Sequence, residues 1–193
     1  IGVFIHELLE ETFSHFLGCQ PVIDKEFKKY FFRTLEKKFE KDIAPRMRAD
    51  VFLLKGIIKS RLEKFLEEEQ SRKVTKIICL EKEFSDTLIV GSQEVKFVYT
   101  VDRIDELYDA SILVIDYKTG GGDFSPKKFK SLEEMDLNRV SIRENIRSFQ
   151  LPLYYYFVKR SYPSTFVNAE LYNIRTLEMK AFIPQEDIAR ADK

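Results

Sequence analysis

A short apolar run that ends in charged residues constrains this chain more than any other feature. Residues 112–115 read Ile-Leu-Val-Ile, and Asp116, Tyr117 and Lys118 follow directly. A continuous apolar run of this length is typical of a strand that is buried on both faces, which requires another layer of structure on each side. We therefore expect a central strand over residues 111–118 inside a layered α/β fold.

Helical and strand-like periodicities assign the rest of the chain to the layers of this fold. The patterns predict helices over residues 1–17, 24–39, a stretch after Pro45 and 145–160. They predict strands over residues 76–80, 94–104 and 111–118, and a final strand pair over residues 165–183 with a turn at 173–176. The short links at residues 91–93 and 106–110 predict an antiparallel meander of the first three strands. Charged residues on the second and third helices are interpreted as solvated surface. We expect one domain over residues 1–193, with a helical front followed by a mixed sheet.

Composition excludes several classes of protein. Hydrophobic residues make up 44% of the chain, which is too many for a disordered protein, and no apolar run approaches the length of a membrane span. The 32 basic and 32 acidic residues cancel, which argues against coating nucleic acid by bulk charge but permits a local basic groove. Cys19 and Cys79 have no paired spacing, so we expect reduced thiols in a cytosolic protein. The chain opens inside a helix without an initiator Met, as expected of a piece of a longer protein.

The charged residues after the central strand form the candidate site. Asp116 and Lys118 are two residues apart and therefore share a strand face. Asp102 lies on the preceding strand, and a turn over residues 107–110 brings it beside Asp116. Two adjacent carboxylates repel unless a proton or a cation intervenes, and Mg²⁺ prefers such oxygen ligands. Taken alone, the Asp-x-Lys pair also fits a simple salt bridge at a strand edge.

Five short motifs, in order along the chain, resemble the RecB-type branch of the PD-(D/E)XK nucleases. The two central ones are Val-Asp-Arg-Ile-Asp at residues 101–105 and Ile-Asp-Tyr-Lys-Thr-Gly at residues 115–120. Gly2 and His6 match a helical G-x-x-x-H motif, residues 80–84 match a glutamate-bearing first strand, and Gln150 and Tyr154 match a downstream Q-x-x-x-Y helix. The resemblance implies a restriction-endonuclease-like core with a mixed sheet flanked by helices.

The resemblance also implies a role for each matched residue. Asp102 and Asp116 would ligate Mg²⁺ or Mn²⁺, with the backbone carbonyl of Tyr117 as a further ligand, and Lys118 would be the catalytic lysine. His6 would be an additional metal ligand from the first helix. The remaining residues have supporting roles: Glu81 would act on the metal, the water or the lysine, and Gln150 and Tyr154 would orient the site or contact the DNA backbone.

Some of these assignments compete with simpler interpretations. A histidine on the flank of an apolar helix face is commonly a packed core residue, and the accompanying motifs favour the ligand role for His6. Glu81 and Glu83 alternate onto one strand face, so only the spacing to Phe84 favours Glu81. The family's Gly and Arg before the central aspartate are replaced by Tyr99 and Thr100. Relatives with an iron–sulfur cluster use four cysteines, which this chain lacks.

The function expected from these residues is metal-dependent hydrolysis of DNA by an exonuclease that acts with a helicase domain or subunit in repair or recombination. Basic residues after the central strand either bind the phosphate backbone or form a solvated loop: Lys127, Lys128, Lys130, Arg139, Arg143 and Arg147. A catalytically silent DNA-binding or scaffold module is the alternative, which the retained Asp102, Asp116 and Lys118 disfavour. A restriction-type endonuclease is disfavoured by His6 and the Gln150 helix.

Overall fold

The computed structural model describes residues 1–47, 50–120, 134–146 and 148–187. The helices of more than one turn are α1 (Gly2–Phe13), α2 (Lys25–Lys38), α3 (Val51–Ser71), α5 (Arg139–Asn145) and α6 (Gln150–Ser161). Short helical turns are η1 (Ser14–Phe16), η2 (Phe39–Ile43), η3 (Ala44–Arg46) and η4 (Gln185–Asp187). The strands are β1 (Val74–Val90), β2 (Gln93–Leu107), β3 (Ile112–Lys118), β4 (Val167–Asn173) and β5 (Met179–Ala181).

The strands form one mixed sheet in the order β1-β2-β3-β4-β5. β1, β2 and β3 are antiparallel neighbours, as the short links predict, and β3 pairs with β4 in parallel. A parallel pair needs a crossover connection, and the chain between β3 and β4 carries α5 and α6. The observed architecture is therefore the expected α/β fold, with a mixed sheet flanked by helices.

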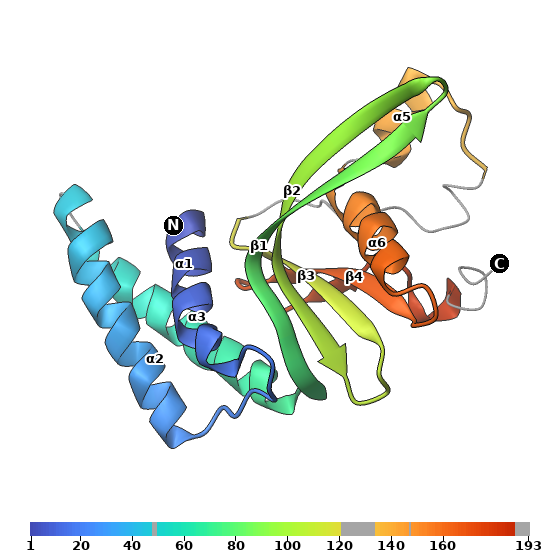
Figure 1. Cartoon of the computed structure of the whole chain (residues 1–193). Coiled ribbons are helices and arrows are strands. Elements are labelled where there is room, and N and C mark those ends of the chain that lie inside the picture. Colours follow the sequence, from blue (N-terminus) through green and yellow to red (C-terminus); the bar gives the residue numbers. More distant parts are fainter. Residues whose placement is uncertain (48–49, 121–133, 147, 188–193) are drawn as a thin grey trace.

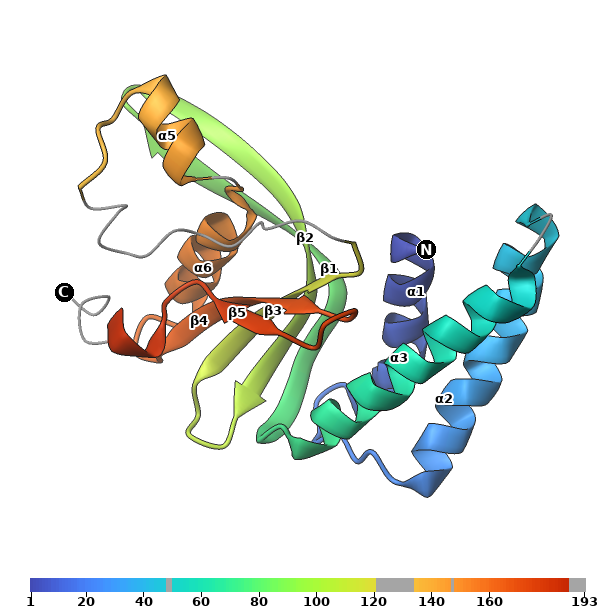
Figure 2. The ribbon, with the colours of Figure 1, turned by 180° about the vertical axis from the view of Figure 1, so that it is seen from behind.

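The two faces of the sheet carry separate apolar cores. Figures 1 and 2 show α1, α2 and α3 on one side of the sheet and α6 on the other. Alternation along β3 explains this, because Leu113, Ile115 and Tyr117 belong to the core under α1–α3, whereas Ile112 and Val114 belong to the core under α6. The apolar run is thus a strand buried on both faces, as predicted.

The N-terminal helices match their expected positions closely. Asp24 caps α2 by accepting a hydrogen bond from the Phe27 amide at 2.8 Å. The solvated interpretation of the α3 charges is wrong at one position, because Glu69 is buried with only 3% of its surface exposed.

Within the described residues, no helix is both long and apolar enough to cross a membrane. Cys19 and Cys79 are free thiols.

The first strand is longer than the apolar pattern over residues 76–80 predicts. β1 continues to Val90 and turns at Gly91, whose φ of +63° suits a tight hairpin. Both views show the outer part of the β1–β2 hairpin reaching past the sheet toward α5. In this arm β2 alternates between exposed and half-buried residues, whereas the outer part of β1 shows no regular alternation. The later helix also differs: residues 139–145 form α5, and α6 begins at Gln150, with Pro152 tolerated in its first turn.

Candidate metal and active site

Strand register places three carboxylates in a row across the sheet. Leu80 pairs with Arg103 and Lys82 with Val101, so Glu81 lies across from Asp102. On the other side of β2, Arg103 pairs with Ile115, and one further step along both strands brings Asp102 level with Asp116. The short turn between β2 and β3 therefore brings the two aspartates together, and β1 adds a third acid.

Glu81 reaches this row through an unusual backbone conformation. Its φ is +40°, in the left-handed region that residues with a Cβ seldom adopt. This residue therefore interrupts the alternation of β1, and Glu81 joins the site while Glu83 stays exposed. Strain of this kind concentrates at functional sites, where the surrounding structure enforces it. Alternation could not separate the two glutamates because it assumes a regular strand.

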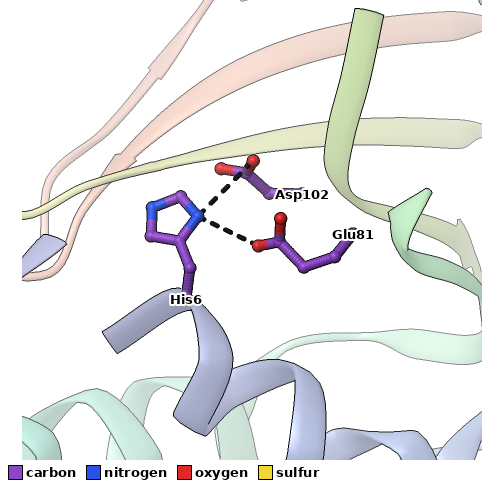
Figure 3. Close-up of side chains that lie close together, drawn as sticks. All are labelled: His6, Glu81 and Asp102. Carbon is purple, nitrogen blue, oxygen red and sulfur yellow. Dashed lines mark hydrogen bonds and ion pairs between the residues drawn. The ribbon is translucent and has the colours of Figure 1, made fainter. Parts of the chain in front are cut away.

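His6 extends from α1 into the same group, as Figure 3 shows. Its Nδ1 lies 2.9 Å from Glu81 Oε1 and 3.6 Å from Asp102 Oδ1. Its Nε2 lies 3.2 Å from the carbonyl oxygen of Tyr117. Both ring nitrogens thus face groups that only accept, which favours the imidazolium. The hydrogen bond to Glu81 accordingly raises the pKa of His6, against the opposing effect of burial.

Asp102 is the most perturbed carboxyl of the row. Its Oδ2 accepts a hydrogen bond from the Tyr117 amide at 2.7 Å. Burial, followed by repulsion from Asp116, raises the pKa of Asp102 to about 7, and His6 acts in the opposite direction. A cation bound in place of the proton would stabilise the ionised form of this buried carboxylate.

Asp116 and Lys118 form a close pair on the face of β3 that looks toward α6. Lys118 Nζ lies 2.6 Å from Asp116 Oδ2, and Asp116 is only 1% exposed. The contact is a short ion pair between the two charges. Burial raises the pKa of Asp116 despite the neighbouring ammonium. The Asp116 carboxylate is therefore paired with the Lys118 ammonium.

Lys118 is also held by a directional chain of hydrogen bonds from α6. Lys118 Nζ donates to Gln150 Oε1 at 3.1 Å, and Gln150 Nε2 donates to the Tyr154 hydroxyl at 2.8 Å. The Tyr154 hydroxyl in turn donates to the carbonyl of Thr100. Because that carbonyl only accepts, the direction of the whole chain is fixed, and the Gln150 amide presents its oxygen to Lys118.

One cavity of about 790 Å³ is lined by the site residues His6, Glu81, Asp102, Asp116, Tyr117, Lys118 and Gln150. Tyr154 is buried and contacts the site through Gln150. Glu7 and Glu10 of α1 also line the cavity, and Glu10 lies one helical turn from His6, a spacing that places both on one face. Sequence reasoning gave no role to Glu7 or to Ser148. A Cβ on Gly2 would lie 3.3 Å from Thr119 Oγ1, so this position needs a small residue where α1 meets the end of β3.

The donor set fits a divalent metal ion. One ligand atom each from His6, Glu81 and Asp102 lies within 4.8 Å of the others. Carboxylate oxygens together with one imidazole nitrogen form a ligand set that suits Mn²⁺. The carboxylate oxygens are also the ligands that Mg²⁺ prefers. The nearest group differs from the expected ligands, because it contains Glu81 while Asp116 turns toward Lys118. The Tyr117 carbonyl oxygen adjoins this group, because it accepts a hydrogen bond from His6.

The expected basic tract is only partly described. Arg139 and Arg143 are exposed on α5. The other members lie outside the described residues: Lys127, Lys128, Lys130 and Arg147.

Comparisons with known proteins give one informative match. The family model for the PD-(D/E)XK nuclease superfamily matches residues 1–191. Among curated proteins, none matches this chain significantly. A solved structure titled "Crystal structure of SSO0001" is 16% identical, with 99% of this chain and 82% of that chain covered and a TM-score of 0.30, which is too low to support an argument.

Proposed function

Because the chain belongs to the PD-(D/E)XK nuclease superfamily, we propose that it is a metal-dependent nuclease that hydrolyses DNA phosphodiester bonds. One observation carries the proposal: three acids, His6 and Lys118 meet in a single open cavity. Excess negative charge there attracts a divalent cation, and the cavity leaves room beside it for a phosphodiester.

The residues divide the chemistry between them. His6, Glu81 and Asp102 would hold the ion, with Asp116 and the Tyr117 carbonyl adjacent. A bound divalent ion supplies Lewis-acid activation of water and offsets charge on the phosphoryl oxygens. Lys118 lies beside Asp116, where its ammonium can align the attacking water or stabilise the negative charge that develops on the phosphoryl oxygens. His6 would act as a ligand only with a neutral imidazole, so it would have to give up the proton that its present hydrogen bonds favour.

We further propose that the protein belongs to the RecB-like branch and works as an exonuclease with a helicase domain or subunit in DNA repair or recombination. The support is the set of flanking motifs: His6 on α1 and Gln150 on α6 both line the cavity, and Tyr154 holds Gln150 through a hydrogen bond. The basic residues after β3 would contact the phosphate backbone of the DNA.

A substrate panel tests both levels of the proposal. The protein is incubated with linear duplex, the same duplex closed into a circle, and linear single strands, with Mg²⁺, Mn²⁺ or chelator. Metal-dependent loss of the linear substrates alone is expected. Cleavage of the circle would refute the exonuclease assignment but keep the nuclease. Binding of DNA with no cleavage of any substrate would favour the silent DNA-binding module.

A further inference from the structure

A second cluster of charged side chains lies buried on the sheet face opposite α6. Arg103 donates from Nε to Asp105 at 2.7 Å and from Nη1 to Glu69 at 2.8 Å. Arg72 donates to Glu69 at 2.9 Å and to Asp105 at 2.8 Å. Arg103 and Asp105 are 0% exposed, so these ion pairs are shielded from solvent. We call Glu69, Arg72, Arg103 and Asp105 the buried charge cluster.

Stability alone is a weak explanation for this cluster. Removing four ionised groups from water is expensive, and apolar residues of similar volume often stabilise a core as well or better. The cluster also remains imperfect, because the buried Arg103 Nη2 has no hydrogen-bond partner among the described residues, although the guanidinium lies over the Phe13 ring. Hydrogen-bonded charged groups fix the orientation of the side chains that they contact, which apolar packing does less well. A buried charge cluster can therefore serve to orient a neighbouring group.

The cluster contacts the candidate metal site through Tyr117. Arg103 Nη1 donates to the Tyr117 hydroxyl at 3.2 Å. The backbone of the same residue holds two candidate ligands, since its amide donates to Asp102 and its carbonyl accepts from His6. Its ring meets the His6 ring edge-on with centroids 6.2 Å apart. The position of Tyr117 therefore affects both ligands at once.

We propose that the buried charge cluster is a positioning device for the metal site. Arg103 holds the Tyr117 side chain on the sheet face opposite α6. The Tyr117 backbone then sets the separation and orientation of His6 and Asp102. Arg103 and the Tyr117 hydroxyl are positioning residues that touch neither substrate nor metal. This inference rests on the proposed function, because it assigns the cluster to that same site.

The chain supplies a matched pair of variants. Tyr117→Phe removes the hydroxyl that Arg103 binds and keeps the buried ring. Tyr172→Phe makes the same change in a ring of the same aromatic group, 5.9 Å from the Tyr117 ring centroid and also buried. No hydrogen bond of the Tyr172 hydroxyl is found among the described residues, so this variant controls for the loss of a hydroxyl from the core.

The test measures Mn²⁺ affinity by calorimetry, kcat and KM on linear DNA, and the thermal midpoint. Loss of a group that orients metal ligands commonly costs about 10–100-fold in metal affinity or activity. We expect Tyr117→Phe to weaken Mn²⁺ binding about tenfold and to lower kcat with little change in KM. Tyr172→Phe should match the parent in all three kinetic and binding values.

The outcomes separate this inference from the proposed function. If the parent binds Mn²⁺ and cleaves DNA while Tyr117→Phe and Tyr172→Phe behave alike, the positioning role is wrong and the nuclease stands. If the parent neither binds Mn²⁺ nor cleaves DNA, both fail together. Arg103→Lys provides a second variant, because it keeps the charge but loses the fork that binds Glu69, Asp105 and Tyr117 simultaneously. It should reproduce the weaker Mn²⁺ binding, and parental affinity in this variant would also overturn the inference.

Discussion

The buried charge cluster and the cavity cluster of His6, Glu81, Asp102, Asp116 and Lys118 adjoin each other at β2 but differ in charge balance. In the buried cluster two arginines meet two acids. Burial opposes ionisation of Glu69, yet Arg103 and Arg72 together hold its pKa below the usual value.

The cavity cluster has the opposite balance. Three acids share one histidine and one lysine, and burial raises the pKa of both Asp102 and Asp116. A balanced cluster is complete within the protein, whereas an acid-rich cluster lacks positive charge. Adjacent residues of β2, Asp102 and Arg103, thus belong to one site that needs a cation and one that does not.

The largest expected effect is on catalysis by the cavity cluster. Lys118→Ala should lower kcat about 10²–10⁴-fold, because it removes an interaction made with the reacting groups. Metal affinity should remain close to parental, since a lysine ammonium is not a ligand. Asp116→Ala should abolish cleavage and also weaken Mg²⁺ or Mn²⁺ binding. A nuclease assay beside calorimetric titration separates the two variants, and parental cleavage by Lys118→Ala would remove this lysine from the mechanism.

The next effect is on stability and concerns the buried cluster. Glu69→Ala leaves Arg103 and Arg72 short of negative charge inside the protein, which should cost about 3–5 kcal/mol of unfolding free energy. Glu68→Ala is the control, because Glu68 is adjacent to Glu69 in the helix and its side chain is exposed. Urea denaturation measures both variants. Equal midpoints for the two would show that the buried cluster is not structurally required.

Removing an acid from the cavity cluster should have the reverse sign. Asp102→Asn relieves a carboxylate whose pKa is raised to about 7 and keeps an oxygen for the Tyr117 amide. Since each pKa unit is worth about 1.4 kcal/mol, the metal-free variant should be more stable than the parent by about 1–3 kcal/mol at neutral pH. The measurement is urea denaturation in chelator. A less stable variant would contradict the view that Asp102 is electrostatically strained.

The same groups give the metal-free protein a defined pH dependence. A folded-state pKa above the unfolded one means that the folded protein binds the proton more tightly, so stability falls as pH rises through the raised value. Asp102 and His6 both shift in this direction. Unfolding free energy in chelator should therefore fall between about pH 5 and pH 8.

Two controls sharpen this pH prediction. Mn²⁺ should restore more stability at the upper end of the range, and Asp102→Asn should flatten the slope. Glu69, whose pKa is lowered, titrates below this window, because its contribution is present above its unfolded pKa of about 4.5 and is lost only as pH falls through the folded value. A flat profile for the parent would contradict the assignment.

Sequence reasoning reached the cavity cluster but missed the buried one, for physical reasons. The turn between β2 and β3 is short, so chain connectivity alone brings Asp102 to Asp116. Alternation does not separate Glu81 from Glu83, because the positive φ of Glu81 is a tertiary effect, and only the family spacing to Phe84 favours Glu81. The helical pattern predicts a solvent-exposed Glu69, whereas its burial depends on where α3 packs against Arg103 of β2. Periodicity predicts which face of a helix or strand is apolar. It does not predict which charged side chains of one element pack against another element.

The smallest expected effect decides how Gln150 and Tyr154 act. If they orient the site, the Tyr154 hydroxyl serves to hold the Gln150 amide with its oxygen toward Lys118. Tyr154→Phe removes two hydrogen bonds, one with Gln150 and one with the Thr100 carbonyl, each worth about 1 kcal/mol. The Gln150 amide can then turn, so kcat should fall about five- to tenfold while KM for DNA stays constant. Tyr156→Phe, on the same helix and exposed, is the control and should change neither value. If these residues contact the DNA backbone instead, Tyr154→Phe should raise KM and flatten the salt dependence of binding, with kcat retained. The two arginines of the buried cluster each pair with two acids. Lys118 instead pairs with one acid, Asp116, and with the neutral amide of Gln150, so its ammonium can still attract the phosphodiester.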